Sequence, residues 1–256
     1  MLSEAALNRS PILKALSSMR KSGARTLLMG GQACVFYGAA EFSRDLDLLI
    51  FVDPDNLDRV RAALADLLAV PIAVPVSQPP LEPELLGRGH AFHFRCKRED
   101  VAGLRVDLMA NLRGGPSFED LWQRRTTLEL DGEVFDLMAR ADLVIAKQTQ
   151  RDKDWPMVAR LVEGSYFAVG SSPSAKDIDF ILRELRTPEI LIEAAARFPQ
   201  AAREIAPHRP AVQAALSGDI EQISRALRSE QDEAIRRDRV WWEPLKRELE
   251  QFRHQR

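Results

Sequence analysis

Residues 27–51 read LLMGGQACVFYGAAEFSRDLDLLIF, and this stretch constrains the fold more than any other part of the chain. An apolar run ends at Gly30 and Gly31, a short helix-compatible segment follows, and a second apolar run begins with Asp45 and Asp47. Because alternate side chains of a strand point to the same face, the two aspartates share one face while the intervening leucine points into the core. The pattern predicts a strand, a glycine turn, a short helix and a second strand with two carboxylates.

The elements around this stretch form a mixed N-terminal part. Ser10 and Pro11 predict the start of a helix that ends at Gly23. After the aspartates, we expect the following elements: a helix over 55–69, a short strand and then an irregular loop within 71–89, paired strands at 90–97 and 104–109, and a hairpin over 126–137 that turns at Asp131-Gly132.

After Asp136 the spacing of apolar residues becomes helical. Helices are predicted over 139–150, 155–163, 175–186 and 190–198, with further amphipathic segments to the end of the chain. The stretch 164–174 has the Gly, Ser and Pro content of a connector. The sequence therefore predicts an α/β (α+β) fold, with a small mixed β-sheet and helices over residues 1–164 and a helical C-terminal region over residues 165–256.

Composition limits the classes of partner. The chain of 256 residues has a formal net charge of −2, which supplies no global attraction to nucleic acid or to an anionic membrane. Cys34 and Cys96 are too few for a disulfide framework and lack the CxxC spacing of a zinc site, so we expect a reducing, cytoplasmic environment. No apolar run approaches the roughly 20 residues that cross a bilayer, and no membrane partner is expected.

A third carboxylate extends the pattern of the two aspartates. Asp107, in RVDLM, lies on a later predicted strand with the same apolar-Asp-apolar pattern. If the two strands are neighbours, three acids on one face make a two-metal site chemically feasible, because hard cations such as magnesium prefer oxygen ligands. The alternative for Asp45 and Asp47 is an edge strand with its polar face in water. For Gly30 and Gly31, backbone N–H groups that face a phosphate are one interpretation, and a tight turn without a ligand is the other.

Taken together, these motifs resemble a known family. Gly30-Gly31, the DLDL of residues 45–48 and the VDL of residues 106–108 resemble the nucleotidyltransferase superfamily, which shares the catalytic fold of DNA polymerase beta. Within it, GGQACVFYG followed by SRDLDL is most similar to bacterial minimal nucleotidyltransferases and to the nucleotidyltransferase toxins of type IV toxin-antitoxin systems.

The resemblance covers roughly residues 25–163. Residues 141–161 are similar to the following helix of that family, in which a lysine, here Lys147, lies near the nucleotide. The chain departs from the family pattern before the first aspartate, where Glu41 and Ser43 replace the arginine and the threonine that relatives often have. Glu41 places an acid where a cation would help to hold triphosphate.

The resemblance implies an enzyme that uses magnesium, or manganese, to move a nucleoside monophosphate from a nucleoside triphosphate such as ATP to an acceptor hydroxyl or phosphate. The first two aspartates would hold two ions, and the third would complete the shell of the second ion and help to take the acceptor's proton. The implied residues are the catalytic, metal-binding carboxylates Asp45, Asp47 and Asp107, and the nucleotide- or phosphate-binding residues Gly30, Gly31, Ser43 and Lys147.

Several alternatives stay open. The acceptor is RNA, a protein or a small molecule, and an antitoxin is a candidate partner. A catalytically silent relative that binds a nucleotide or a partner protein is favoured by Glu41, and a helical interaction module on an N-terminal scaffold is a further hypothesis. His93, Arg95 and Lys97 share one face of their predicted strand. These three side chains could approach a phosphate or an acceptor, but a solvated polar face is the favoured interpretation.

Overall fold

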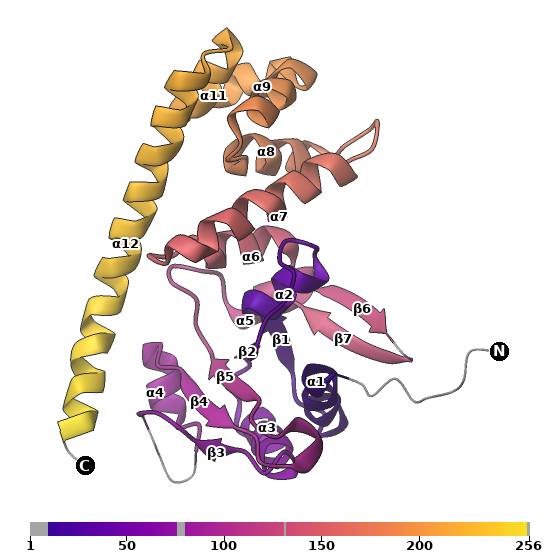
Figure 1. Ribbon diagram of the computed structural model, residues 1–256, viewed down its shortest axis with the longest axis vertical. Helices are drawn as coiled ribbons and strands as arrows, with labels where there is room; N and C mark the ends of the chain where they lie inside the picture. The colour runs from indigo at the N-terminus through magenta and orange to yellow at the C-terminus, as the bar shows by residue number, and fades with distance from the viewer. Residues whose placement is uncertain (1–9, 76–79, 131, 255–256) are drawn as a thin grey trace. The chain divides into compact units, whose positions relative to one another are not determined.

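The computed structural model describes residues 10–75, 80–130 and 132–254 (Figure 1). The chain forms two compact units, each with its own buried apolar side chains. Unit 1 comprises Met1–Ala33, Phe42–Ala139 and Pro244–Arg256, and unit 2 comprises Cys34–Glu41 and Arg140–Glu243.

Unit 1 is built on a mixed sheet, which among the described residues has seven strands in the order β3-β4-β5-β2-β1-β7-β6. The pairs β2–β5 and β1–β7 are parallel, and the other neighbours are antiparallel. This mixed sheet with helices confirms the predicted α/β fold class. The strands are β1 (Thr26–Met29), β2 (Asp45–Ile50), β3 (Val70–Pro71), β4 (Phe92–Arg95), β5 (Arg105–Met109), β6 (Thr126–Leu130) and β7 (Glu133–Leu137).

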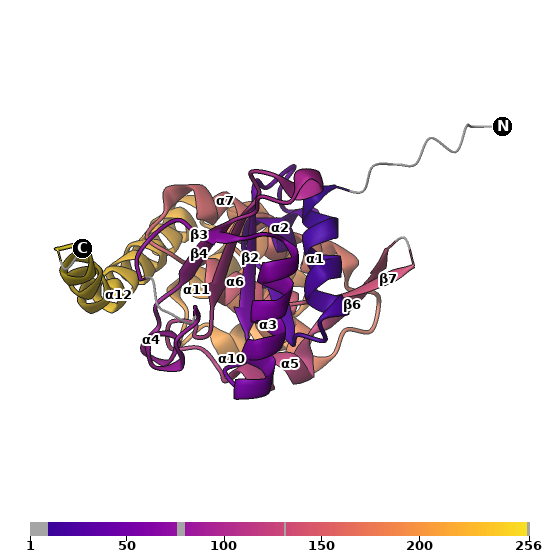
Figure 2. The same cartoon turned by 90° about the horizontal axis from the view of Figure 1, so that it is seen from below.

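The first helix of this sheet region begins at the capping residue that the sequence predicts. Ser10 caps α1 (Pro11–Lys21) through a hydrogen bond from the backbone N–H of Leu13 to its side-chain oxygen, at 3.3 Å. α1 lies beside α3 (Pro54–Asp66), as Figure 2 shows. α2 (Gly30–Phe36) begins directly at the glycine pair.

One helix of this part of the chain was not expected from the sequence, and one hairpin was. The loop expected within 71–89 contains the helix α4 (Pro83–Arg88), which ends at Gly89 with a φ of 101°. A helix of six residues is too short to show a 3.6-residue period, so the sequence pattern missed it. The hairpin of β6 and β7 forms as predicted, although Asp131 of its turn lies outside the described residues.

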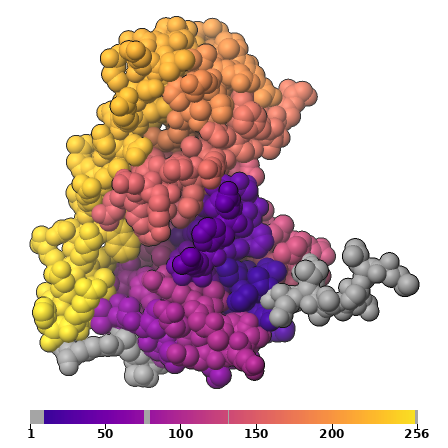
Figure 3. All heavy atoms as spheres, in the orientation of Figure 1, coloured from indigo at the N-terminus to yellow at the C-terminus, as the bar shows by residue number. Residues whose placement is uncertain are grey.

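Unit 2 consists of helices. α7 continues to Ala168, so the connector expected over 164–174 is confined to 169–174. Figure 3 draws this helical part with all heavy atoms as spheres, from orange to yellow toward the end of the chain. The helices are α6 (Arg140–Lys147), α7 (Trp155–Ala168), α8 (Ala175–Glu184), α9 (Pro188–Arg197), α10 (Pro199–Ile205), α11 (Pro210–Ser217) and α12 (Ile220–His254), the last of which continues into unit 1. Across the described ranges, none of the helices combines the length and apolarity required to traverse a bilayer.

Candidate active site

The strand register brings the three predicted carboxylates to one face of the sheet. β2 and β5 are parallel neighbours, and Asp47 pairs directly with Asp107 (Figure 1). Asp45, two residues before Asp47, lies on the same face. Leu46 and Val106 point the other way and are fully buried. The condition set by the sequence, that the two strands be neighbours, is therefore met.

β4 adds basic side chains to the same face. It pairs antiparallel with β5, so that His93 lies opposite Asp107 and Arg95 lies opposite Arg105. The three strands therefore present two rows of side chains, which we call the carboxylate face. The first row is Asp45, Arg105 and Arg95, and the second is Asp47, Asp107 and His93.

Asp107 is held by two of these neighbours. The Nδ1 atom of His93 lies 2.8 Å from Asp107 Oδ1, and Arg105 Nε donates to the same oxygen at 2.8 Å. The Asp107 side chain is only 11% exposed. Burial raises the pKa of Asp107, but the hydrogen bonds from His93 and Arg105 outweigh burial, and the net pKa lies below its ordinary value. Asp107 is therefore an ionised carboxylate at neutral pH.

Arg105 is the cation that faces the three aspartates. The hydrogen bond from Arg105 to Asp107 raises the pKa of Arg105, and burial partly offsets this rise. The negative charges of Asp107, Asp45 and Asp47 raise the pKa further. One guanidinium thus offsets the repulsion between three carboxylates that the strand register places together. Arg105 therefore gives the carboxylate face an internal counter-ion.

The glycine pair makes room for the site residues. Gly30 has a φ of +68°, and a β-carbon built on it would lie 2.5 Å from Cγ and 2.6 Å from Cβ of Asp47. A β-carbon on Gly31 would lie 2.8 Å from Ser43 Oγ. Gly30 is therefore required for the close approach of Asp47 to the start of α2, and Gly31 leaves room for the Ser43 hydroxyl in its present rotamer. Their predicted contacts with phosphate stay predictions.

Ser43 and Lys147 have local partners. Ser43 Oγ donates to the backbone carbonyl of Asp45 at 3.3 Å, directly before β2. Lys147 lies in unit 2, where its Nζ atom donates to Asp154 Oδ1 at 3.2 Å, and Thr149 Oγ1 donates to the other oxygen of Asp154 at 2.7 Å. Asp154 is buried, and the Lys147 side chain is only 12% exposed. Lys147 is therefore not a solvated surface lysine, and its contact with a nucleotide stays a prediction.

The donor atoms of the carboxylate face suit a hard divalent cation. Three carboxylates on one sheet face are the ligands that magnesium and manganese prefer. In the part of the chain that the structure describes, no three His, Cys, Asp or Glu side chains converge into a ready metal-binding group. His93 and Arg105 both engage Oδ1 of Asp107, which leaves Oδ2 of Asp107 with the carboxylates of Asp45 and Asp47 as the candidate donors.

The sequence interpretation missed the contacts of two residues of the carboxylate face, His93 and Arg105, with Asp107. The strand pattern favours a solvated face for His93 and gives Arg105 no role, whereas the structure places both side chains against Asp107. The available signal was the spacing, since Arg105 lies two residues before Asp107 and shares its face. The contact of His93 depends on the β4–β5 register, which the sequence does not specify.

Comparison with known proteins finds a likeness among solved structures. No protein-family model matches the chain, and no curated protein sequence matches it. Among solved structures, the chain is similar to the crystal structure of an antigenic nucleotidyltransferase-like protein from Paracoccidioides brasiliensis. The TM-score is 0.41 at 17% sequence identity, over 80% of this chain and 93% of that chain. At that TM-score and identity the likeness does not establish a shared function, and the inferences below depend on the chain's own residues.

Proposed function

We propose that this chain is a metal-dependent nucleotidyltransferase that moves a nucleoside monophosphate from a nucleoside triphosphate to an acceptor hydroxyl or phosphate. The observation that carries the proposal is the β2–β5 register, which pairs Asp47 with Asp107 and leaves Asp45 on the same face. The ordered glycine pair, DLDL and VDL motifs of the sequence support it.

The proposed roles follow from the contacts of each side chain. Asp45, Asp47 and Asp107 would hold magnesium or manganese, and such ions stabilise charge on the attacking and leaving oxygens of a phosphoryl displacement. The acceptor oxygen would attack the α-phosphorus, and the bond to pyrophosphate would break. Asp107, kept ionised by His93 and Arg105, would accept the proton of an acceptor hydroxyl.

The proposed nucleotide contacts come from two parts of the sequence, before the DLDL motif and well after it. Backbone N–H groups of Gly30 and Gly31 would face phosphate oxygens, and Ser43 would lie beside them. Lys147 would neutralise charge on the nucleotide once it exchanges its partner Asp154 for a phosphate. A toxin-like role, with RNA, a protein or a small molecule as the acceptor and an antitoxin as a partner, is the finer form of the proposal.

The test is label transfer by the purified protein. Each labelled nucleoside triphosphate is incubated with magnesium or manganese and a cell extract, with and without ribonuclease, for the wild type and for Asp45→Asn/Asp47→Asn. Transfer by the wild type that is lost in the double variant is expected, while Asp55→Asn, at an exposed position of α3, retains it. Transfer that persists in the double variant would contradict the proposal.

A second candidate function is a catalytically silent protein of this type that binds a nucleotide or a partner protein. It is favoured by Glu41 and by the engagement of Asp107 Oδ1 with His93 and Arg105. Calorimetric titration with a nucleotide separates the two candidates. Nucleotide binding without transfer to any acceptor supports the silent form, and magnesium-dependent binding with transfer supports the enzyme.

A further inference from the structure

Arg186, in the segment between α8 and α9, is a buried cation with few partners. Its side chain is 11% exposed. Nε and Nη1 are buried, and within the described ranges neither atom has a hydrogen-bond partner. The carboxylate of Glu230 on α12 lies 3.4 Å from Nη1. Buried polar groups are nearly always hydrogen-bonded, so this arrangement requires an explanation.

The surrounding carboxylates are engaged elsewhere. Arg209 forms two hydrogen bonds with Glu230, both at 3.0 Å, and two more with backbone carbonyls of the α8 region. Glu184, the second carboxylate, accepts a hydrogen bond from Gln148 Nε2 at 2.6 Å, and burial raises its pKa. Burial lowers the pKa of Arg186, and the positive charge of Arg209 lowers it further. The negative charge of Glu230 opposes this decrease. The Arg186 guanidinium, protonated at neutral pH, therefore shares its nearest anion with a stronger competitor.

A cavity of about 570 Å³ adjoins this guanidinium. Arg186 and Trp155 both line it, and the Arg186 Cζ atom lies over the Trp155 ring, 4.9 Å from its centre. Arg228 of α12 lines the same cavity, and so does Asp152 of the short 3-10 helix that precedes α7. Two guanidinium groups and one carboxylate leave the lining with an excess of positive charge.

We propose that this cavity of unit 2 binds a small organic anion whose carboxylate or phosphate group pairs with Arg186 and Arg228. The volume lies within the usual range for small-molecule sites. Trp155, Pro156, Pro188 and Leu227 give the ligand an apolar wall, so a ligand with a flat apolar body is favoured over a bare ion. A modest rotation of the Arg186 side chain toward the cavity would give its N–H groups the acceptor that they lack.

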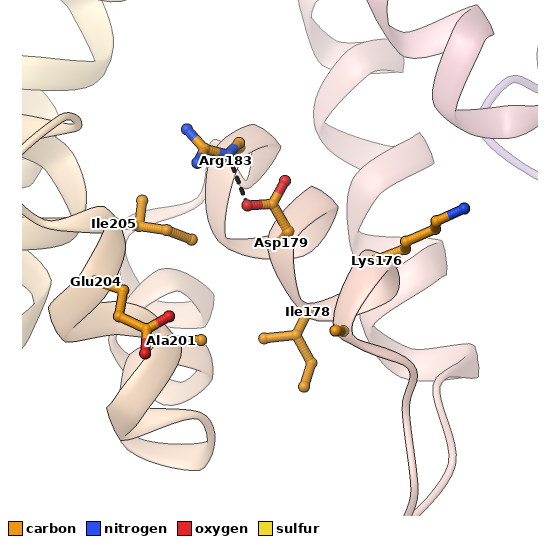
Figure 4. Close-up of a pocket in the computed structure, with 8 residues that line it drawn as sticks. Lys176, Ile178, Asp179, Arg183, Ala201, Glu204 and Ile205 are labelled. Atoms are coloured by element: carbon orange, nitrogen blue, oxygen red, sulfur yellow. Dashed lines mark hydrogen bonds and ion pairs between the residues drawn. The ribbon is translucent and has the colours of Figure 1, made fainter.

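A second cavity of the same unit provides a contrast. It has a volume of about 520 Å³ and lies between α8 and α10 (Figure 4). Its arginine, Arg183, donates to Asp179 at 2.7 Å and is exposed, and Lys176 and Glu204 add one charge of each sign. The charged residues of that lining number two of each sign, whereas the lining beside Arg186 has two arginines and one carboxylate.

The test uses the full chain carrying Asp45→Asn/Asp47→Asn, without added metal, so that the carboxylate face does not contribute. Phenyl phosphate, benzoate and inorganic phosphate are titrated by calorimetry and by thermal unfolding. Saturable binding of phenyl phosphate or benzoate is expected, tighter than that of inorganic phosphate, and the two organic probes distinguish a phosphate from a carboxylate ligand. An absence of saturable binding by either organic probe would overturn the proposal.

Substitutions of single arginines show in which of the two cavities the organic anion binds. Arg186→Gln is expected to weaken binding about tenfold or more, because it removes a charged hydrogen-bond donor from a buried site. Arg228→Gln, an exposed change that leaves the core intact, is expected to weaken it by a smaller factor. Arg183→Gln is the matched control from the other cavity and should bind as the parent protein does. If both the Arg228 variant and a folded Arg186 variant bind the organic probes as tightly as the parent protein does, the site is refuted, whatever the outcome of the transfer assay.

Discussion

The carboxylate face of unit 1 and the arginine pair of unit 2, Arg186 and Arg209, each bring like charges together. The two sites differ in how far oppositely charged partners neutralise those charges. On the carboxylate face, Asp107 accepts hydrogen bonds from two donors, and Arg105 faces all three aspartates. In unit 2, Arg186 and Arg209 share Glu230, and of these two arginines Arg209 is the one that forms hydrogen bonds with it. The two sites therefore differ in how many of their buried polar atoms are hydrogen-bonded. Asp107 Oδ1 has two donors, whereas Arg186 Nε and Nη1 have no acceptor among the described residues.

The largest expected effect is the loss of stability when Arg209 of unit 2 is replaced, compared with the loss when Arg186 is replaced. Arg209→Gln should lower the free energy of unfolding by about 3–5 kcal/mol, because it leaves Glu230 and two buried carbonyls without their donor. Arg186→Gln should lower it by about 1 kcal/mol or less, since it breaks fewer hydrogen bonds. Urea unfolding of both variants measures the difference, and equal losses would show that the two arginines are equally structural.

The next effect concerns the glycine that supports Asp47. Gly30→Ala should lower the free energy of unfolding by about 2 kcal/mol and reduce nucleotidyl transfer about a hundredfold, because the new methyl group would displace the Asp47 carboxylate. Gly38→Ala is the matched control, since Gly38 also has a positive φ, +75°, but has open space around its missing side chain. If the two variants behave alike in the transfer assay, backbone strain rather than Asp47 explains the glycine.

Asp107 should make stability depend on acid pH. Its pKa in the folded chain lies below the ordinary value of 3.8, so its ionised form stabilises the fold above that pH, and this contribution is lost as pH falls through the folded pKa. Asp107→Asn should therefore reduce the loss of unfolding free energy between pH 6 and pH 3 by about 1 kcal/mol. Urea unfolding at the two pH values tests this, with Asp55→Asn as the exposed control. An unchanged pH dependence would show that His93 and Arg105 do not stabilise the ionised form.

The smallest expected effect is that of His93. His93→Ala should reduce transfer about tenfold, because Asp107 would lose one of the two donors that orient it. His93→Asn keeps a donor near the position of Nδ1 and should restore most of the activity. Manganese titration by calorimetry should show the same order of the two variants. Restoration by neither residue type would assign His93 a role other than holding Asp107.

Local sequence patterns predicted much of unit 1. The strand, glycine pair, short helix and DLDL strand over residues 26–50 form as expected, because each depends on side-chain alternation or on a backbone turn that is encoded locally. α4 was missed since six residues do not complete a recognisable period, and α7 continued past Gly164 because a single glycine is tolerated within a packed helix.

The sequence by itself determined which residues carry the carboxylates, and it placed Asp45 and Asp47 on one face through the two-residue period of a strand. It also predicted that Asp107 lies on a strand of the same kind. Only the tertiary structure decided that Asp47 and Asp107 are register partners and that His93 and Arg105 hold one oxygen of Asp107. Strand order and register depend on contacts between distant segments, and the shortage of hydrogen-bond partners around Arg186 arises in the same way from the packing of α7, α8 and α12.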